Sequence, residues 1–149
     1  MNKYIFLFVF LFFNLLIKAQ DMKNAANVNY VLGDLEVLDK IELTKIYVAK
    51  LNKLSSITPY IPFGELQPKT PSELRIPATS INEKAMDSYS KTIQAYNQDS
   101  DAALSNLIPY ADKKDIMDAI MFMQEMIAKI EAMGEKIKNQ YKKGANTTE

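Results

Sequence analysis

Carboxylates and thioethers are the side chains with which this sequence could do acid–base or metal chemistry, because the chain contains no His and no Cys. Without imidazole and thiol groups it has no catalytic triad, thiolate nucleophile or zinc finger. Asp112, Asp115 and Asp118 are the nearest approach to paired catalytic carboxylates. They also stand at the predicted start of a helix, where the helix dipole favours acids. We therefore assign them a structural role and predict that the protein is not an enzyme.

The methionines are the second candidate for metal binding. Five of the eight lie between Met117 and Met133, and thioethers are ligands for Cu(I). Methionine also fills irregular cores and lines adaptable protein-binding surfaces. With no His or Cys to complete a copper site, we favour the packing role and predict no metal and no cofactor.

A third pattern resembles the start of a calcium loop. Asn97, Asp99 and Asp101 occupy alternate positions, as the first ligands of such a loop do. The later positions do not fit, because Ala102 replaces the glycine of the turn and Ile108 replaces the bidentate glutamate. Turn formation and helix capping explain these polar residues better.

The N-terminal segment has the features of a secretory signal. Lys3 precedes an apolar run from Tyr4 to Ile17, which is shorter than the roughly 20 residues that a membrane-spanning helix needs. Cleavage between Ala19 and Gln20 would leave a small residue at the last position of the signal. We predict that residues 1–19 are a signal peptide and that the protein is exported to the periplasm or the extracellular medium. An uncleaved anchor is the alternative.

Residues 20–149 have the size of one domain, and we predict a single helical domain over this range. Loss of the signal removes Lys3 and Lys18 but no acid from a chain with 18 basic and 18 acidic side chains. The slight acidic excess that remains is not typical of a nucleic-acid-binding protein, whose affinity depends on neutralising phosphates. We expect residues 20–30, rich in Asn and Ala, to be a frayed leader.

The first helix is predicted from Asp34 to about Leu54. Its apolar residues recur near helical spacing: Leu35, Leu38, Ile41, Ile46, Ala49 and Leu51. The stretch Ile41–Thr44 also alternates as a strand does, so the sequence leaves open whether the segment is helical throughout.

Residues 59–79 form a proline-rich connection. Five of the six prolines lie between Pro59 and Pro77, and each removes an amide donor and disfavours helix at the preceding residue. The apolar residues of the segment, such as Phe63 and Leu74, would be superfluous in a flexible linker. We predict an extended strap packed over the helices, with a free peptide-like arm as the alternative.

The segment from Ser80 to Ile108 is predicted to form two helices. Ser80 and Glu83 fit a capping box, and apolar residues then recur on one face to about Asn97: Ile81, Ala85, Tyr89, Ile93 and Tyr96. A short helix from Asp101 to Ile108 follows, and Pro109 ends it.

The longest helix is predicted from about Lys113 to Tyr141, capped by Asp112. Apolar residues alternate by four and three along it, as in a heptad seam: Ile116, Ile120, Met123, Ile127, Ile130, Gly134, Ile137 and Tyr141. Between Ile116 and Met123 every residue except Asp118 is apolar, so this part is either enclosed or touches a partner. Beyond Glu131 only a stripe remains, which we expect to project and to be available to another chain.

The end of this helix is basic. Lys136, Lys138, Lys142 and Lys143 lie there with no acid among them. Cations are favoured at a helix C-terminus, although contact with an anionic membrane is an alternative. We favour the structural role because the rest of the chain is not basic.

These patterns together predict an all-α fold: a small three- to four-helix bundle with a long C-terminal helix and a proline-rich extended strap. We predict a non-enzymatic protein that acts by contact with another protein or with itself, as an adaptor, assembly subunit or inhibitor. The alternatives are a client-holding chaperone with a Met-rich face and a membrane-surface-active helical protein. The predicted partner-binding residues are Met117, Met121, Phe122, Met126, Ile130, Ile137 and Tyr141.

Overall fold

The computed structural model describes residues 25–145, so the predicted signal peptide and its cleavage site at Ala19 and Gln20 lie outside the described residues. The described part of the chain is mostly helical and contains no strand, as the all-α prediction requires. Its α-helices and 3₁₀ helices are, in chain order, α2 (Leu32–Glu36), α3 (Lys40–Ile57), η1 (Thr58–Phe63), η2 (Pro71–Leu74), α4 (Ser80–Leu107), η3 (Ile108–Tyr110) and α5 (Lys113–Ala145).

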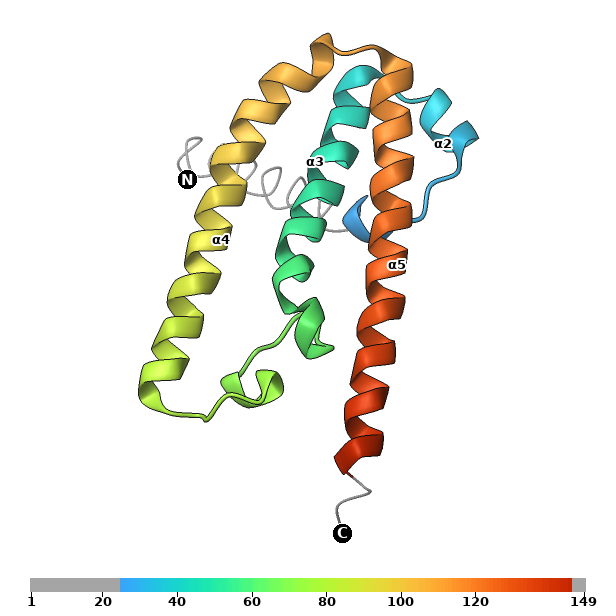
Figure 1. Cartoon of the computed structure of the whole chain (residues 1–149). Coiled ribbons are helices and arrows are strands. Elements are labelled where there is room, and N and C mark those ends of the chain that lie inside the picture. The colour runs from blue at the N-terminus through green and yellow to red at the C-terminus, as the bar shows by residue number, and fades with distance from the viewer. Residues whose placement is uncertain (1–24, 146–149) are drawn as a thin grey trace, which may run out of the picture.

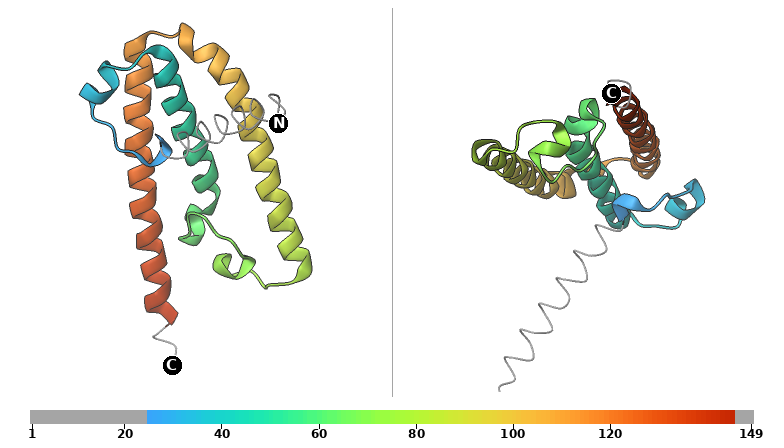
Figure 2. Two further views of the ribbon diagram at one scale, coloured as in Figure 1. Left: turned by 180° about the vertical axis from the view of Figure 1, so that it is seen from behind. Right: turned by 90° about the horizontal axis from the view of Figure 1, so that it is seen from below.

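The three long helices form an open layer with α3 in the middle. Figure 1 shows α4 on one side of α3 and α5 on the other, with α3 and α5 running in the same direction and α4 running back between them in the chain. The view from below in Figure 2 shows the same order. Within the described chain, α3 packs extensively against both neighbours, whereas α4 and α5 scarcely touch. Each outer helix is therefore covered from one side only by the layer.

The predicted first helix is interrupted. The structure has a short helix, α2, and then a separate helix, α3, so the expectation of one helix from Asp34 to Leu54 is wrong at its start. Asp39 causes the new start: its carboxylate accepts the Glu42 N–H at 2.8 Å, and the Glu42 carboxylate accepts the Asp39 N–H at 3.0 Å. This reciprocal capping box is a strong helix start. The strand alternative for Ile41–Thr44 is also wrong, since these residues belong to α3.

Helix α4 is continuous where two helices were predicted. It runs from Ser80 to Leu107, and its N-cap is Thr79, whose hydroxyl accepts the Asn82 N–H at 3.3 Å. The cap is thus one residue earlier than the predicted Ser80. The helix continues past Asn97 because the polar side chains there bond to α3 instead of ending the helix: the Asn97 amide oxygen accepts the Ser55 hydroxyl at 3.0 Å.

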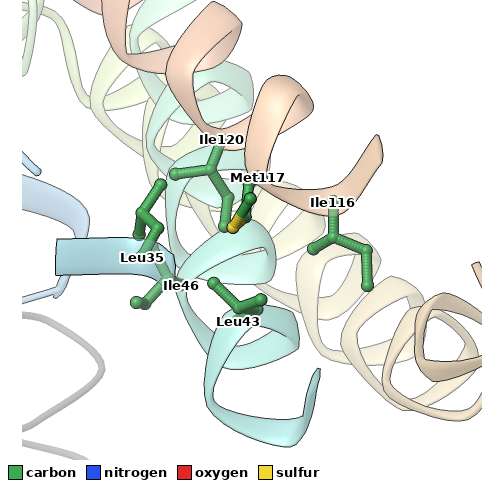
Figure 3. Close-up of a cluster of buried hydrophobic side chains, with 6 residues drawn as sticks. All are labelled: Leu35, Leu43, Ile46, Ile116, Met117 and Ile120. Carbon is green, nitrogen blue, oxygen red and sulfur yellow. The ribbon is translucent and has the colours of Figure 1, made fainter. Parts of the chain in front are cut away.

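The main core lies between α2, α3 and α5. Figure 3 shows six buried side chains that converge there: Leu35, Leu43, Ile46, Ile116, Met117 and Ile120. Burial of such side chains is the dominant favourable term in folding, about 1.5–3 kcal/mol for each large aliphatic residue. The core therefore joins the beginning of the described chain to its last helix.

The proline-rich connection is more coiled than the predicted extended strap, because η1 and η2 are 3₁₀ helices. It crosses α5 at two glycines. A Cβ on Gly64 would lie 2.7 Å from the Lys138 backbone nitrogen, and a Cβ on Gly134 would lie 3.2 Å from the Leu66 side chain. The absence of a side chain at both positions lets the connection lie directly on the second half of α5.

The residues before α2 are tied to the helices, so the expectation of a frayed leader is wrong for residues 25–30. Lys50 of α3 is 1% exposed, and its ammonium group donates to the backbone oxygens of Ala26 at 3.1 Å and Val28 at 2.6 Å. Tyr30 exchanges two hydrogen bonds with the Gln124 side chain of α5, at 2.8 and 3.0 Å. Desolvation by burial, followed by repulsion from Lys53, lowers the pKa of Lys50 below its usual 10.5.

Candidate protein-interaction surface

Helix α5 carries two different faces along its 33 residues. The inner face is the predicted heptad seam, in which Ile116, Ile120, Met123 and Ile127 are buried. Its second half is covered by the proline-rich connection, so it does not project freely as we expected. The inner seam is used largely within the chain.

The outer face of α5 is not covered by any other described element. Three large apolar side chains stand on it, which we call the outer stripe: Phe122 is 62% exposed, Met126 37% and Met133 53%. They follow one another by four and seven residues, which places them on one side of a helix. Apolar side chains aligned in this way on a surface mark a site of contact with a partner.

The seven residues predicted to bind a partner divide between the two faces. Phe122 and Met126 belong to the exposed outer stripe, whereas Met117 is buried in the core and Met121 packs beside it. Met133, which the sequence analysis did not include, completes the stripe.

The three remaining predicted residues, Ile130, Ile137 and Tyr141, lie on the inner side. Ile130 and Ile137 are half-buried, and Ile137 contacts Gly64 of the connection. The Arg75 guanidinium lies 3.5 Å from the centre of the Tyr141 ring, which is a cation–π contact. Tyr141 is nevertheless 47% exposed. Partner binding by these three residues stays a prediction, and a partner of Ile137 or of the covered face of Tyr141 would have to displace contacts within the chain.

Charged residues frame the outer stripe in an ordered way. Asp115, Asp118 and Glu125 lie on the same face towards the start of α5, and Lys129 and Lys136 lie on it towards the end. The Glu125 carboxylate pairs with Lys129 at 2.6 Å, and this hydrogen bond lowers the pKa of Glu125. Exposed pairs of this kind contribute little to stability, so these charges can exchange partners at small cost.

Asp118 has the same arrangement with the residue one turn before it. Its carboxylate pairs with Lys114 at 2.6 Å, and the hydrogen bond raises the pKa of Lys114. Among the described residues no three acidic side chains converge to form a metal site. The three aspartates at the start of α5 are thus placed on the surface, and Asp118 has a lysine partner.

A second candidate surface is the groove between α3 and α4. A depression of about 350 Å³ lies there beside Tyr96 and Leu104, and a smaller one of about 190 Å³ lies between α4 and the proline-rich connection, beside Tyr60 and Tyr89. The rings of Tyr60 and Tyr89 meet edge to face with their centres 6.3 Å apart. Polar contacts join α3 to α4, such as the hydrogen bond that the Asn52 side-chain amide donates to the Asp101 carboxylate at 2.8 Å.

The basic end of α5 is partly engaged within the chain. The Lys138 ammonium pairs with both carboxylate oxygens of Glu65, at 2.9 and 3.0 Å. None of the described helices combines the length and apolar character needed to cross a membrane.

Comparisons of the chain with known protein families, curated proteins and solved structures gave no match. Two features of the site were missed in the sequence. The outer stripe could have been predicted from the sequence, since Met126 and Met133 are one heptad apart, as residues of the inner seam are. The burial of Lys50 had no sequence signal.

Proposed function

We propose that this chain is an exported, non-enzymatic helical protein that acts by binding protein through the outer face of α5. The observation that carries the proposal is the exposure of Phe122, Met126 and Met133 in one line along a helix. An aromatic ring and two flexible thioethers, framed by charges, have the composition of an interface centre and its rim. We include in the proposal that the long helices and the proline-rich connection act as one unit, which presents this face.

Export is the second part of the proposal. It rests on the signal-like composition of residues 1–19 and not on the described structure. Mass spectrometry of the protein isolated from the envelope and the medium of its own cells tests it. A mass that begins at Gln20 would support export, and retention of the full chain in the cytoplasm would contradict it.

The experiment that tests binding is crosslinking in the protein's own cells, followed by identification of the crosslinked species. We expect Phe122→Asp to remove the principal crosslinked product, because a charge in the centre of an apolar interface is left desolvated and unpaired. The matched control is Ile81→Asp, since Ile81 is 76% exposed on α4 and lies far from the outer stripe. Equal crosslinking by both variants would show that the outer stripe is not the interface.

A client-holding chaperone is the second candidate function. It is favoured by two apolar depressions along α4: Tyr96 lines the one against α3, and Tyr60, Met86 and Tyr89 line the one against the proline-rich connection. Such a surface adapts to many sequences. Suppression of the aggregation of an unfolded test protein, lost in Tyr89→Asp but not in Phe122→Asp, would favour this function over the first.

A further inference from the structure

The outer face of α5 is electrically divided into two halves. In helical register with the outer stripe stand Asp115, Asp118 and Glu125 on the first half, with Lys114 beside Asp118, and Lys129 and Lys136 on the second. Lys143 continues the basic half. All of these residues are exposed, and no acid stands on this face after Glu125. The face therefore runs from negative to positive, with the apolar stripe across the change of sign.

We propose that the outer face of α5 binds the same face of a second copy of this chain, with the two helices antiparallel. The proposal rests on the proposed function, because it names the partner of the same stripe. The contact would be isologous about a twofold axis, which is the commonest arrangement of protein dimers.

Charge complementarity selects the antiparallel direction. If the twofold axis passes midway between Phe122 and Met133, each Phe122 lies opposite Met133 of the other copy. The same register places Lys136 beside Asp118 of the other copy. A parallel pair would instead set acids against acids and lysines against lysines, which is destabilising.

The site of the stripe on the molecule leaves room for a second helix. Gln124, which holds Tyr30, follows Phe122 by two residues and thus points to nearly the opposite side of α5. Residues 25–30 are therefore turned away from the stripe. Helix α5 stands at the edge of the open layer (Figure 1), so a second helix can reach it without displacing α4.

Analytical ultracentrifugation of the naturally processed protein over a wide range of concentration tests the self-association. We expect a reversible dimer whose dissociation constant rises about tenfold or more in Phe122→Asp and is unchanged in Ile81→Asp. A wild-type protein that stays monomeric at all concentrations would overturn the inference. In that case the crosslinking in cells separates the two proposals. If Phe122→Asp removes a crosslink to another protein, the proposed function stands with a foreign partner. If Phe122→Asp removes no crosslink, the proposed function and the dimer proposal are both wrong.

A charge-reversal cycle tests the register. Asp118→Lys and Lys136→Asp should each weaken the dimer by about five- to tenfold, because each sets like charges against each other across the twofold axis. The double variant should regain most of the wild-type affinity. Asp87→Lys on α4 is the matched control, since Asp87 pairs with Lys91 at 2.6 Å as Asp118 pairs with Lys114. A double variant as weak as the single variants would overturn the proposed register.

Cysteine crosslinking tests the direction, and the sequence contains no Cys to interfere. Residues 122 and 133 are about 16 Å apart along one helix. Asp115 and Gln140 lie in line with the stripe, outside it, and the same register places each opposite the other in the second copy. In the antiparallel dimer the double variant Asp115→Cys/Gln140→Cys should crosslink rapidly between copies, and Asp115→Cys alone should not. Rapid disulfide formation by Asp115→Cys alone would show a parallel pair and overturn the inference.

Discussion

Helices α4 and α5 flank the same helix, yet they are held in different ways. Helix α5 buries five side chains of its first half, from Ile116 to Ile127. Helix α4 has 28 residues and buries none of them. The difference originates in α3, which presents Leu43 and Ile46 towards α5 and polar side chains such as Asn52 towards α4.

An amphipathic sequence therefore does not by itself determine how deeply a helix is buried. An apolar interface gains free energy from every side chain removed from water. A hydrogen bond between polar side chains contributes only about 1 kcal/mol, because water offers the same bond in the unfolded chain. We therefore expect α4 to open locally while α3 and α5 remain packed.

The largest expected effect is a loss of stability when the apolar contact between α3 and α5 is weakened. Ile120 is fully buried, whereas Ile93 of α4 is half-buried. Ile120→Ala should lower the free energy of unfolding by about 3 kcal/mol through lost burial and the cavity left behind, and Ile93→Ala by about 1 kcal/mol or less. Urea denaturation measures both. Equal losses would show that α4 is as firmly packed as α5.

The next effect concerns the connection that lies on α5. Gly64 has a φ of 71°, and an added Cβ would meet the Lys138 backbone at 2.7 Å. Gly64→Ala should therefore cost about 2 kcal/mol or more of stability. Gly33 of α2 has no atom within 4 Å of an added Cβ, so Gly33→Ala should be neutral or slightly stabilising. Thermal unfolding measures both variants. Similar behaviour of the two variants would contradict a direct contact between the connection and α5.

A smaller effect is expected for the polar contact between α3 and α4. Asn52→Ala removes the hydrogen bond to Asp101 and should lower overall stability by about 1 kcal/mol or less. Hydrogen exchange followed by mass spectrometry should nevertheless show faster exchange in peptides from α4, with peptides from α5 unchanged. Faster exchange in both helices would mean that α4 and α5 unfold as one unit.

The smallest effect concerns the charge buried on the α5 side of α3. Because burial lowers the pKa of Lys50 in the folded chain, the unfolded chain binds more protons between that pKa and the usual 10.5. Stability should therefore rise with pH in this window. Lys50→Met should flatten the rise in urea denaturation, and parallel profiles for the two proteins would contradict it.

Much of the helical architecture could be predicted from spacing and capping alone. The start of α5 at Lys113 is as predicted, because Asp112 and the heptad seam give a clear local signal. The break before Lys40 was missed because no Gly or Pro marks it, although Asp39 and Glu42 have the spacing of a capping box. The unity of α4 was missed because Asn97 and Asp101 have helix-ending character in isolation, and only their contacts with α3 override it.

The interaction surface was less predictable, because exposure depends on which element covers which face. The heptad seam of α5 has the pattern of an interface between helices. In the structure it packs largely against other elements of the same chain. Lys50 shows most clearly that burial is hard to predict from sequence, since nothing in its sequence neighbourhood distinguishes it from the exposed Lys45. Its burial follows from residues 25–30 folding back over α3.

The position of α5 at the end of the chain has a consequence for biosynthesis. A chain that is synthesised from its N-terminus delivers α3 early, with Leu43 and Ile46 uncovered. The residues that cover them, Ile116 and Ile120, emerge only after the whole of α4. The nascent chain must therefore pass through a period in which its most apolar helix waits for its partner, and a ribosome that stalled in η3 would leave a product without a core.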